Sequence, residues 1–424
     1  MICLQAASAQ IGSVSDMKYG LIGEKLGHSF SKAIHESIAD YTYEIKEIAK
    51  GDLDFFMKEK SFLGINVTIP YKSAVIPYLD FIDANAEKIG AVNTVVCRDG
   101  RLYGYNTDFG GMKALIEKAG FDFIGSKVLI LGSGGTSKTA NAVAESLGAK
   151  QIITVSRSGE VNYDNAHILH KDCDYIINTT PCGMYPNNET AAIDPSLFTC
   201  LKGIVDAVYN PLETTLVRLG REKGIRGETG LYMLVAQAVL ACEIFTGRSL
   251  DVKSITDEVF AKMLREKQNI VLIGMPGSGK STIGRLLGEI SGKHFIDTDD
   301  MITEKHGVIS EIFAQHGEGY FRDIEAEAVR EAAKKSGMII ATGGGAILRK
   351  ENVDALKQNG VIFFLNRPIE DIMPTSDRPL SSDFEALKKR FSERYDKYKA
   401  AGDHEIFIDG NPENAAKKIL EIMK

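Results

Sequence analysis

Residues 269–292 read NIVLIGMPGSGKSTIGRLLGEISG and decide the fold of the C-terminal third of the chain. The first five residues predict a buried strand, and the stretch after the glycine-rich turn predicts a helix. The turn itself, GMPGSGKS at 274–281, satisfies the phosphate-loop pattern GxxxxGK[ST] in the context that the pattern requires. Backbone amides of such a loop surround phosphates, its lysine neutralises them and its serine binds Mg²⁺. We therefore predict an ATP and Mg²⁺ site made by Gly277, Ser278, Gly279, Lys280, Ser281 and Thr282.

A second strand, turn and helix lie upstream, where residues 127–149 read KVLILGSGGTSKTANAVAESLGA. The turn predicts a dinucleotide site at a helix N-terminus, where small residues let the backbone approach a pyrophosphate. Its residues are Gly132, Ser133, Gly134 and Gly135. Ser137 takes the third glycine position of the fingerprint, so a tight turn without a ligand stays an alternative.

The strand that follows this unit ends in Ser156, Arg157 and Ser158, where NAD-binding chains place a carboxylate. An arginine flanked by hydroxyls suits a 2′-phosphate, because it supplies charged donors and does not repel the anion. The sequence therefore favours NADPH/NADP+ over NAD. A solvated charge at the end of a strand is the alternative for Arg157.

Short β-branched runs alternate with helical segments along the chain, which predicts an α/β protein. Residues 1–16 lack the pattern of a signal peptide, so we expect a short N-terminal extension there. Translation starting at Met17 is the alternative. The expected divisions are a substrate-binding α/β domain at 17–119 completed by a helix at 231–247, a Rossmann domain at 120–235, a connector helix at 248–268 and a phosphate-loop domain with a parallel sheet at 269–424.

The composition of the 424 residues narrows the partners and the compartment. A net charge of -7 argues against a nucleic-acid partner, and no apolar run approaches the roughly 18 residues of a membrane span. The six cysteines show no metal-ligand spacing, which fits reduced thiols in the cytoplasm. We expect a soluble cytoplasmic protein, and its state as monomer or homodimer stays open.

Several spaced motifs cover about residues 17–250. They are HSFS (28–31), NVTIPYK (66–72), AVNT (91–94), GYNTD (104–108), GSGG with SRS, NTTPCGMYP (178–186), DAVYNP (206–211) and MLVAQA (233–238). With these motifs the segment resembles the shikimate dehydrogenases, which reduce 3-dehydroshikimate to shikimate.

The resemblance implies a role for individual residues of these motifs. Lys72 and Asp108 are the implied catalytic pair, and both also contact the substrate. The implied further substrate ligands are Ser29, Ser31, Thr68, Asn93, Tyr209 and Gln237, and Gly230 is expected beside NADP. Reduction of a ketone places negative charge on its oxygen, and a lysine supplies both a cation and a proton there. Lys32 stands where the family is expected to have proline, which affects the turn but keeps both serines.

A second set of motifs runs from about Asn269 to the C-terminus. Besides the phosphate loop, it comprises DTDD (297–300), EIFAQHGEGYFRDIE (311–325), ATGGG (341–345), DRPL (377–380) and RYDKY (394–398). This region resembles the shikimate kinases, which phosphorylate shikimate with ATP.

The second resemblance implies that Asp299 binds the acceptor hydroxyl as a catalytic residue, and that Asp297 supports the metal together with Ser281. Arg378 is expected on a lid that reaches the ATP phosphates, as a catalytic residue. The implied shikimate ligands besides Asp299 are Arg322, Gly343, Gly344, Gly345 and Arg394. Two arginines suit one carboxylate, since their forked donors match its geometry.

Together the segments predict two consecutive reactions on one chain, with shikimate passing from the first site to the second. Two alternatives stay open for the N-terminal part: a non-catalytic shikimate sensor that regulates the kinase, and an NAD-using quinate or shikimate dehydrogenase. Lys72, Asp108 and Arg157 count against them. Each part carries its own nucleotide loop and substrate residues, so we expect independent domains joined by a spacer helix.

Overall fold

The computed structural model describes residues 17–27, 29–372 and 384–424. These residues form two compact units. The first contains the described residues up to Ala114, with Gly134–Ser146 and Met233–Val259, and the second contains Leu115–Ser133, Leu147–Tyr232 and Phe260–Lys424. Three sheets organise the two units, one in the first and two in the second.

The sheet of the first unit has the strand order β2-β1-β3-β5-β6-β4. Strands β1, β2 and β3 are parallel to one another, whereas β5 is antiparallel to both β3 and β6. Its strands are β1 Tyr19–Gly23, β2 Tyr43–Glu47, β3 Gly64–Val67, β4 Phe81–Ile82, β5 Thr94–Arg98 and β6 Arg101–Tyr105. The associated helices are α1 Ser31–Ile38, α2 Leu53–Glu59, α3 Ala84–Ile89 and α4 Thr107–Ala119.

The first sheet of the second unit is parallel throughout, in the order β11-β10-β9-β7-β8. Its strands are β7 Lys127–Leu131, β8 Gln151–Val155, β9 Tyr175–Asn178, β10 Gly203–Asp206 and β11 Arg226–Thr229. The helices between residues 135 and 267 are α5 Gly135–Ser146, α6 Ala166–Leu169, α7 Thr215–Glu222, α8 Leu231–Thr246 and α9 Val252–Lys267, of which α5 and most of α8 belong to the first unit. Parallel strands align their carboxyl ends, so the loops after β7, β9 and β10 leave the same edge of this sheet.

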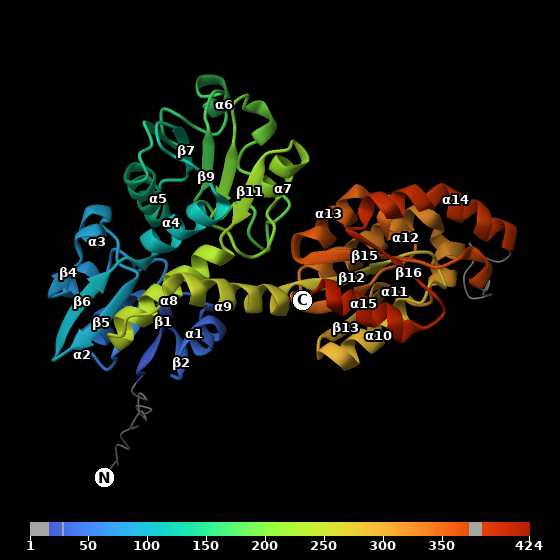
Figure 1. The fold of residues 1–424 in the computed structure, drawn as a ribbon, viewed down its shortest axis with the longest axis horizontal. Helices are drawn as coiled ribbons and strands as arrows, with labels where there is room; N and C mark the ends of the chain where they lie inside the picture. Colours follow the sequence, from blue (N-terminus) through green and yellow to red (C-terminus); the bar gives the residue numbers. More distant parts are fainter. Residues whose placement is uncertain (1–16, 28, 373–383) are drawn as a thin grey trace, which may run out of the picture. The chain divides into compact units, whose positions relative to one another are not determined.

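The second sheet of this unit is also parallel, in the order β13-β14-β12-β15-β16. Its strands are β12 Asn269–Ile273, β13 His294–Asp297, β14 Met338–Ala341, β15 Gly360–Asn366 and β16 His404–Phe407. Its helices are α10 Lys280–Ser291, α11 Thr298–His306, α12 Ile309–Ala333, α13 Lys350–Asn359, α14 Phe384–Ala401 and α15 Pro412–Ile422 (Figure 1). Within α12, Gly317 has φ 79° and ψ 175°, which marks a kink between two helical segments.

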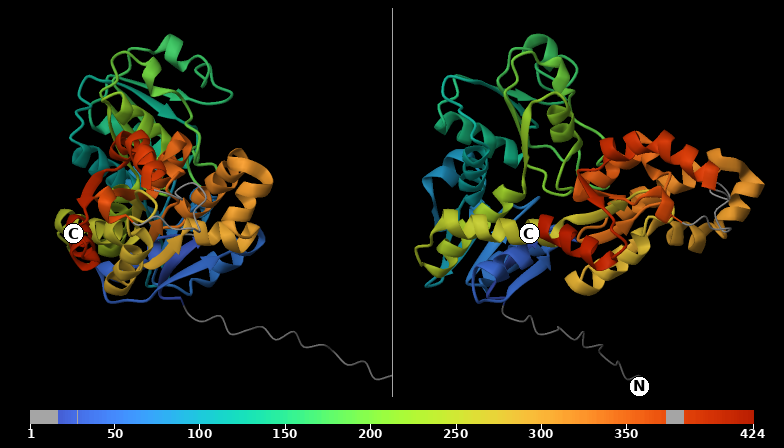
Figure 2. Two further views of the ribbon diagram at one scale, coloured as in Figure 1. Left: turned by 90° about the vertical axis from the view of Figure 1, so that its right-hand side faces the viewer. Right: turned by 45° about the vertical axis from the view of Figure 1, so that its right-hand side comes forward.

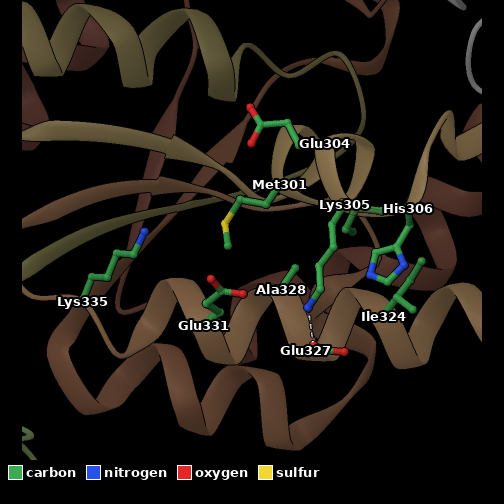
Figure 3. Close-up of a pocket in the computed structure, with 10 residues that line it drawn as sticks. Met301, Glu304, Lys305, His306, Ile324, Glu327, Ala328, Glu331 and Lys335 are labelled. Atoms are coloured by element: carbon green, nitrogen blue, oxygen red, sulfur yellow. Dashed lines mark hydrogen bonds and ion pairs between the residues drawn. The ribbon is translucent and has the colours of Figure 1, made fainter.

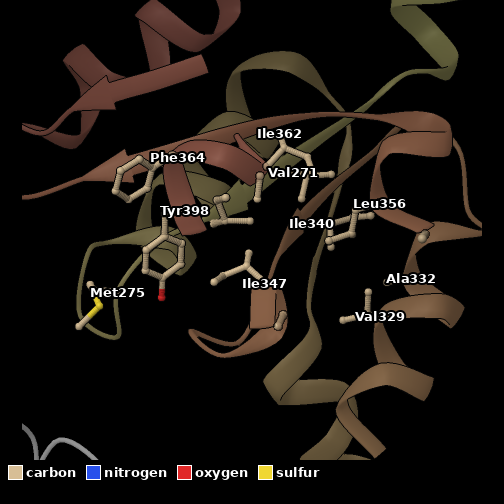
Figure 4. Close-up of a cluster of buried hydrophobic side chains, with 14 of the residues drawn as sticks. Val271, Met275, Val329, Ala332, Ile340, Ile347, Leu356, Ile362, Phe364 and Tyr398 are labelled. Carbon is tan, nitrogen blue, oxygen red and sulfur yellow. The ribbon is translucent and has the colours of Figure 1, made fainter. Parts of the chain in front are cut away.

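Helices cover both faces of this second parallel sheet (Figure 2). Alternate residues of β12 pack against the helices on opposite faces. Val271 and Ile273 lie in the core beneath α12, α13 and α14, which Figure 4 shows around Phe364 and Tyr398. Ile270 and Leu272 pack on the other face against α10 and α15. Because both faces are buried, every residue of β12 is buried, as expected for a central parallel strand.

Candidate functional sites

The expected catalytic pair of the first unit is in direct contact. Lys72 follows the cis Ile69–Pro70 peptide, and Asp108 lies in the first turn of α4. The ammonium Nζ of Lys72 lies 2.5 Å from Oδ2 of Asp108, and the two side chains are 19% and 12% exposed. A charged pair that is mostly withdrawn from water, yet still partly exposed, can present an oriented ammonium to a bound molecule.

A buried hydrogen-bond network centred on Thr107, the chain neighbour of Asp108, fixes two of the predicted substrate ligands. The Oδ1 atom of Asn93 accepts from the backbone N–H of Thr107 at 2.7 Å, and its Nδ2 donates to the Thr107 hydroxyl at 3.0 Å. The same hydroxyl donates to Oε1 of Gln237 at 3.4 Å. Asn93 is 3% exposed and Gln237 is 7% exposed, so their orientation is set by Thr107 before any ligand binds.

The two predicted serines lie together at the start of α1, whose first residue is Ser31. The hydroxyl of Ser29 donates to the hydroxyl of Ser31 at 3.0 Å, and the Ser31 backbone N–H donates to Oγ of Ser29 at 3.2 Å. Lys32 extends away to Glu36, at 2.5 Å, and to the backbone carbonyl of Tyr43. Substitution of the expected proline by lysine therefore leaves the serine pair intact.

Thr68 follows strand β3 and is half-buried, and its backbone N–H donates to the Ile22 carbonyl at 3.0 Å. Its methyl group lies where a side chain on Gly23 would have to go, 2.7 Å from a Cβ built there. The position of Thr68 is therefore set by close packing against β1.

The predicted dinucleotide turn follows β7. Gly132 has φ +108°, and a Cβ built there would lie 2.9 Å from the Thr179 hydroxyl, so this position requires glycine. Cβ atoms built on Gly134 and Gly135 would meet no atom within 4 Å, and Ser133 is exposed. Open space above a backbone without side chains, at the start of α5, fits a pyrophosphate.

The residues predicted to choose between NADP and NAD lie just after β8. Arg157 and Ser158 are exposed and Ser156 is half-buried. The backbone N–H of Ser156 donates to the Val161 carbonyl at 3.1 Å, which closes a short turn. An exposed guanidinium on this turn is accessible to a phosphate from solution.

The loop after β10 carries Tyr209, which is half-buried, and burial raises the pKa of its phenol. Gly230 packs against the same loop: its N–H donates to the Val208 carbonyl at 2.9 Å, and a Cβ built on it would collide with the Ala207 carbonyl oxygen. Glycine is therefore required at 230 by packing, which positions the loop before Tyr209.

The phosphate loop between β12 and α10 is formed by three glycines with positive φ, at 274, 277 and 279. The Lys280 ammonium donates to the carbonyls of Gly274 and Met275, both at 3.0 Å, so it lies folded over the loop. Ser278 is fully buried, and its N–H donates to the Met275 carbonyl at 3.1 Å. Its side chain is therefore packed inside the turn. Thr282, in contrast, is exposed on α10.

The two predicted metal ligands touch each other across this loop. The hydroxyl of Ser281 donates to Oδ2 of Asp297 at 2.6 Å, and Oδ1 of Asp297 accepts from the Asp299 backbone N–H at 3.0 Å. Within the described part of the chain, no group of three or more His, Cys, Asp or Glu side chains could hold a metal. One hydroxyl and one carboxylate fit Mg²⁺, which usually takes its other ligands from phosphates and water.

The predicted shikimate ligands of the C-terminal domain converge on the three glycines after β14. A Cβ on Gly345 would collide with Nη1 of Arg322, and one on Gly343 would lie 2.8 Å from Oδ1 of Asp299. The Nη1 atom of Arg394 donates to the Gly344 carbonyl at 3.0 Å. Arg322 is 9% exposed and Arg394 is 8% exposed. The guanidinium groups of Arg322 and Arg394 and the carboxylate of Asp299 thus lie close to the backbone of residues 343–345.

Two residues of these sites escaped the sequence analysis. Glu325, 1% exposed, accepts from Nη1 of Arg322 at 2.6 Å, and its other carboxylate oxygen has no hydrogen-bond partner among the described residues. The spacing of three between Arg322 and Glu325 on one helix could have indicated this pair. Thr107, the centre of the network around Asn93, gave no comparable signal.

Arg378 and His28 lie outside the described residues.

A groove of 310 Å³ lies between α11 and α12, lined by Met301, Glu304, Lys305, Glu327 and Glu331 among others (Figure 3). None of the predicted site residues lines it. Two of its charged residues, Lys305 and Glu327, form an ion pair at 2.6 Å. In residues 17–27, 29–372 and 384–424, no helix combines the length and apolar character needed to cross a bilayer.

Three family models match separate stretches of the chain. The shikimate dehydrogenase substrate binding domain matches residues 21–95, the shikimate 5'-dehydrogenase C-terminal domain matches residues 230–260, and shikimate kinase matches residues 276–424. The two resemblances found in the sequence are therefore confirmed.

Individual relatives agree with these models over the N-terminal part. The shikimate dehydrogenase (NADP(+)) of Clostridium perfringens is 37% identical over 266 residues, which are 58% of this chain and 97% of the relative. The crystal structure of shikimate dehydrogenase 1 from Peptoclostridium difficile is 37% identical with a TM-score of 0.54, over 58% of this chain and 97% of that one.

The shikimate 5-dehydrogenase of Thermus thermophilus, solved in complex with NADP(H) and shikimate, is 27% identical with a TM-score of 0.52 and covers 58% of this chain and 99% of its own. Residues 276–424 lie beyond the length of such relatives and match the kinase model instead. The chain therefore belongs to the shikimate dehydrogenase family and is a bifunctional fusion that carries a shikimate kinase domain at its C-terminal end.

Proposed function

We propose that the chain reduces 3-dehydroshikimate to shikimate with NADPH and then phosphorylates shikimate with ATP to give shikimate 3-phosphate, in the cytoplasm. The observation that carries the proposal is the close pair of Lys72 and Asp108, retained on the same chain as a complete phosphate loop. A non-catalytic sensor has no need of an ammonium oriented by a carboxylate.

In the first reaction NADPH supplies the hydride. Lys72 donates a proton to the carbonyl oxygen of 3-dehydroshikimate, so that the ketone becomes a hydroxyl group. Asp108 holds the ammonium in place, and the neutral amine left behind can regain a proton from water because Lys72 is 19% exposed. Asn93 and Gln237, fixed by Thr107, are assigned to the substrate hydroxyls.

The predicted cofactor preference rests on Arg157. Its exposed guanidinium can bind a 2′-phosphate. Residues 156–158 include no aspartate or glutamate that could bind the ribose hydroxyls of NAD. Gly134 and Gly135 leave space for the pyrophosphate.

In the second reaction ATP supplies the phosphoryl group, and Mg²⁺ would be held by Ser281 and Asp297. Asp299 accepts the proton of the attacking shikimate hydroxyl. Lys280 is assigned to the phosphates, and leaves the carbonyls of Gly274 and Met275 to reach them. Arg378 is assigned to the charge on the transferring group, in the manner of an arginine finger.

Arg322 and Arg394 are assigned to the carboxylate of shikimate. Arg322 already contacts Glu318 and Glu325, but the two contacts differ in burial. The side chain of Glu318 is 53% exposed, so a substrate carboxylate can replace it at little cost, whereas that of Glu325 is 1% exposed and stays in place. Glu325 then keeps the guanidinium oriented.

The test is an assay of the purified chain with 3-dehydroshikimate, NADPH and ATP together. Formation of shikimate 3-phosphate, with NADPH consumed in equal amount when ATP is in excess, supports both activities. Phosphorylation of added shikimate without oxidation of NADPH would favour the sensor, and equal rates with NADH would favour the NAD-using quinate or shikimate dehydrogenase.

A further inference from the structure

The two parallel sheets of the second unit are joined by buried polar contacts. The end of α13, at Gln358 and Asn359, meets the loops that follow β9 and β10. The Gln358 side-chain amide donates to the Asn188 carbonyl at 3.0 Å, and the Asn188 side-chain amide donates back to Oε1 of Gln358. The Glu213 N–H donates to the Gln358 carbonyl at 2.8 Å.

Asn359 extends the same contact to a second point on each loop. Its Oδ1 accepts from the Leu212 N–H at 3.0 Å, and its Nδ2 donates to the Tyr185 hydroxyl at 2.9 Å. Asn188, Gln358 and Asn359 are 5%, 4% and 2% exposed. Buried amides that lose their partners are costly, so such reciprocal pairs favour one arrangement of the two loops.

Two ion pairs lie at the edge of this contact. Lys350 lies 3.2 Å from Glu222, and Arg218 lies 3.4 Å from Asp354. Lys350 and Glu222 are exposed, and exposed pairs contribute little free energy, whereas Arg218 and Asp354 are 14% and 26% exposed and add to the contact. The reciprocal amide contacts are the most buried part of the contact, at 2% to 5% exposed.

The loops held in this way belong to the reducing site. Both leave the carboxyl edge of the sheet, as Gly132 does, and the loop after β10 carries Tyr209 only three residues before Leu212. The Tyr185 N–H also donates to the Asn210 carbonyl at 3.4 Å, which ties the two loops to each other beside Tyr209.

Buried Asp206 anchors the inner side of the same loops. Its carboxylate accepts from the Asn178 side chain at 2.9 Å, the Val208 N–H at 3.0 Å and the Thr214 hydroxyl at 2.7 Å. Thr215 donates to the Asn188 carbonyl at 2.8 Å. The loops are thus fixed by Asp206 on one side and by α13 on the other.

On the kinase side the contact avoids the catalytic loops. Asn359 directly precedes β15, at the amino end of that strand, and Gly360 pairs in register with Asn269 at the amino end of β12. The phosphate loop leaves the carboxyl end of β12, a strand of five residues or about 16 Å away. The contact therefore joins the amino ends of the kinase strands, away from the phosphate loop, to the loops at the carboxyl ends of β9 and β10.

We propose that the kinase domain is a positioning element for the dehydrogenase: through Gln358 and Asn359 it holds the loops that carry Tyr209, while its own catalysis does not depend on the contact. The inference rests on the proposed reduction of 3-dehydroshikimate. It differs from the expectation of independent domains joined by a spacer, because it makes one activity depend on the other domain in one direction only.

The test uses three variants of the full-length chain, Gln358→Ala/Asn359→Ala, Asn188→Ala and the control Glu351→Ala, which changes an exposed residue of the same helix. Both activities are measured in each preparation, with KM for each substrate and the thermal midpoint. We expect kcat/KM for 3-dehydroshikimate to fall roughly fivefold in the first two variants. The kinase constants and the control should stay within about twofold of the parent.

KM for NADPH should change less than KM for 3-dehydroshikimate, because the glycine turn and Arg157 follow β7 and β8 and take no part in the contact, and only Gly230 of the predicted NADP residues packs against the loop that carries Tyr209. Unchanged dehydrogenase constants in both variants would overturn the proposal. So would equal losses of both activities, since these would indicate general destabilisation. A parent chain without dehydrogenase activity would instead count against the proposed function, which separates the two failures.

Discussion

The two nucleotide loops of this chain share a strand, a glycine-rich turn and a helix of 12 residues, yet they place positive charge differently. In the kinase domain Lys280 starts the helix and folds back onto its own loop carbonyls. In the dinucleotide turn, Lys138 lies on the first turn of α5, and its ammonium lies 4.0 Å from a Cβ built on Gly90.

The difference follows from where each reaction develops charge. A transferring phosphoryl group is itself the reacting centre, so a cation belongs on the loop that holds it. A pyrophosphate in a dinucleotide only anchors the cofactor, and the charge of reduction appears on the ketone oxygen. The reducing site accordingly has its ammonium on Lys72, which precedes the dinucleotide turn by about 60 residues in the sequence and is no part of that turn. Similar turns therefore do not imply similar catalytic roles.

The largest effect is expected at Lys72. Lys72→Ala should lower the rate of 3-dehydroshikimate reduction by roughly 10²–10⁴-fold, because the proton donor at the ketone oxygen is lost. Phosphorylation of added shikimate should be unchanged. Steady-state kinetics of both activities measure this, with Lys58→Ala as a matched control, since Lys58 pairs with Asp54 on the surface. Near-normal reduction by Lys72→Ala would place the catalytic cation elsewhere.

Lys280→Ala tests the other half of the comparison. Loss of the cation on the phosphate loop should reduce kinase turnover by roughly 10²–10³-fold and leave NADPH oxidation intact. Lys305→Ala, which removes an exposed ion pair with Glu327, is the control. A comparable loss of both activities in Lys280→Ala would show that the loop supports the fold of the whole chain.

Asp299→Asn should have a smaller effect on kinase turnover, about 10²-fold, at the lower end for loss of a proton acceptor. ATP should still bind, because the phosphate loop is unchanged, and binding can be followed by calorimetry with a non-hydrolysable ATP analogue. Failure of the variant to bind nucleotide would assign Asp299 a structural role beside Gly343.

The smallest effect is expected at Arg157, whose contact is on the surface. Arg157→Gln should raise KM for NADPH roughly tenfold, the value of about one charged hydrogen bond, and change KM for NADH little. The ratio of the two constants in one preparation is its own control. Equal increases for both cofactors would mean that Arg157 does not bind the 2′-phosphate.

The sequence predicted the α/β class and both families correctly, because their signals are local. A strand, a glycine turn and a helix, or a motif of a few residues, can be read without knowledge of the fold. The contact between Lys72 and Asp108 was also predictable, but only through the resemblance, since 36 residues separate the two.

Contacts without a local pattern could not be predicted. Gln358 and Asn188 are 170 residues apart, and both belong to residue types that are usually exposed, so nothing in the sequence marks them as buried partners. Thr107 has two roles, at the start of α4 and at the centre of a polar network, and only the fold reveals the second. The connector was predicted as a helix, and α9 is one, but its end is fixed to the kinase domain by Lys293, which donates to three carbonyls at 265, 266 and 268.

The three glycines after β14 have a consequence for inhibition and resistance. A Cβ would collide with Glu325 at Gly343, with the ring of Pro276 at Gly344 and with Arg322 at Gly345, so none of these positions can gain a side chain without moving a site residue or the phosphate loop. Gly317 and Gly319, in contrast, have open space around them. An inhibitor that hydrogen-bonds to the backbone at 343–345 would therefore bind a surface whose glycines cannot gain a side chain without displacing Glu325, Pro276 or Arg322.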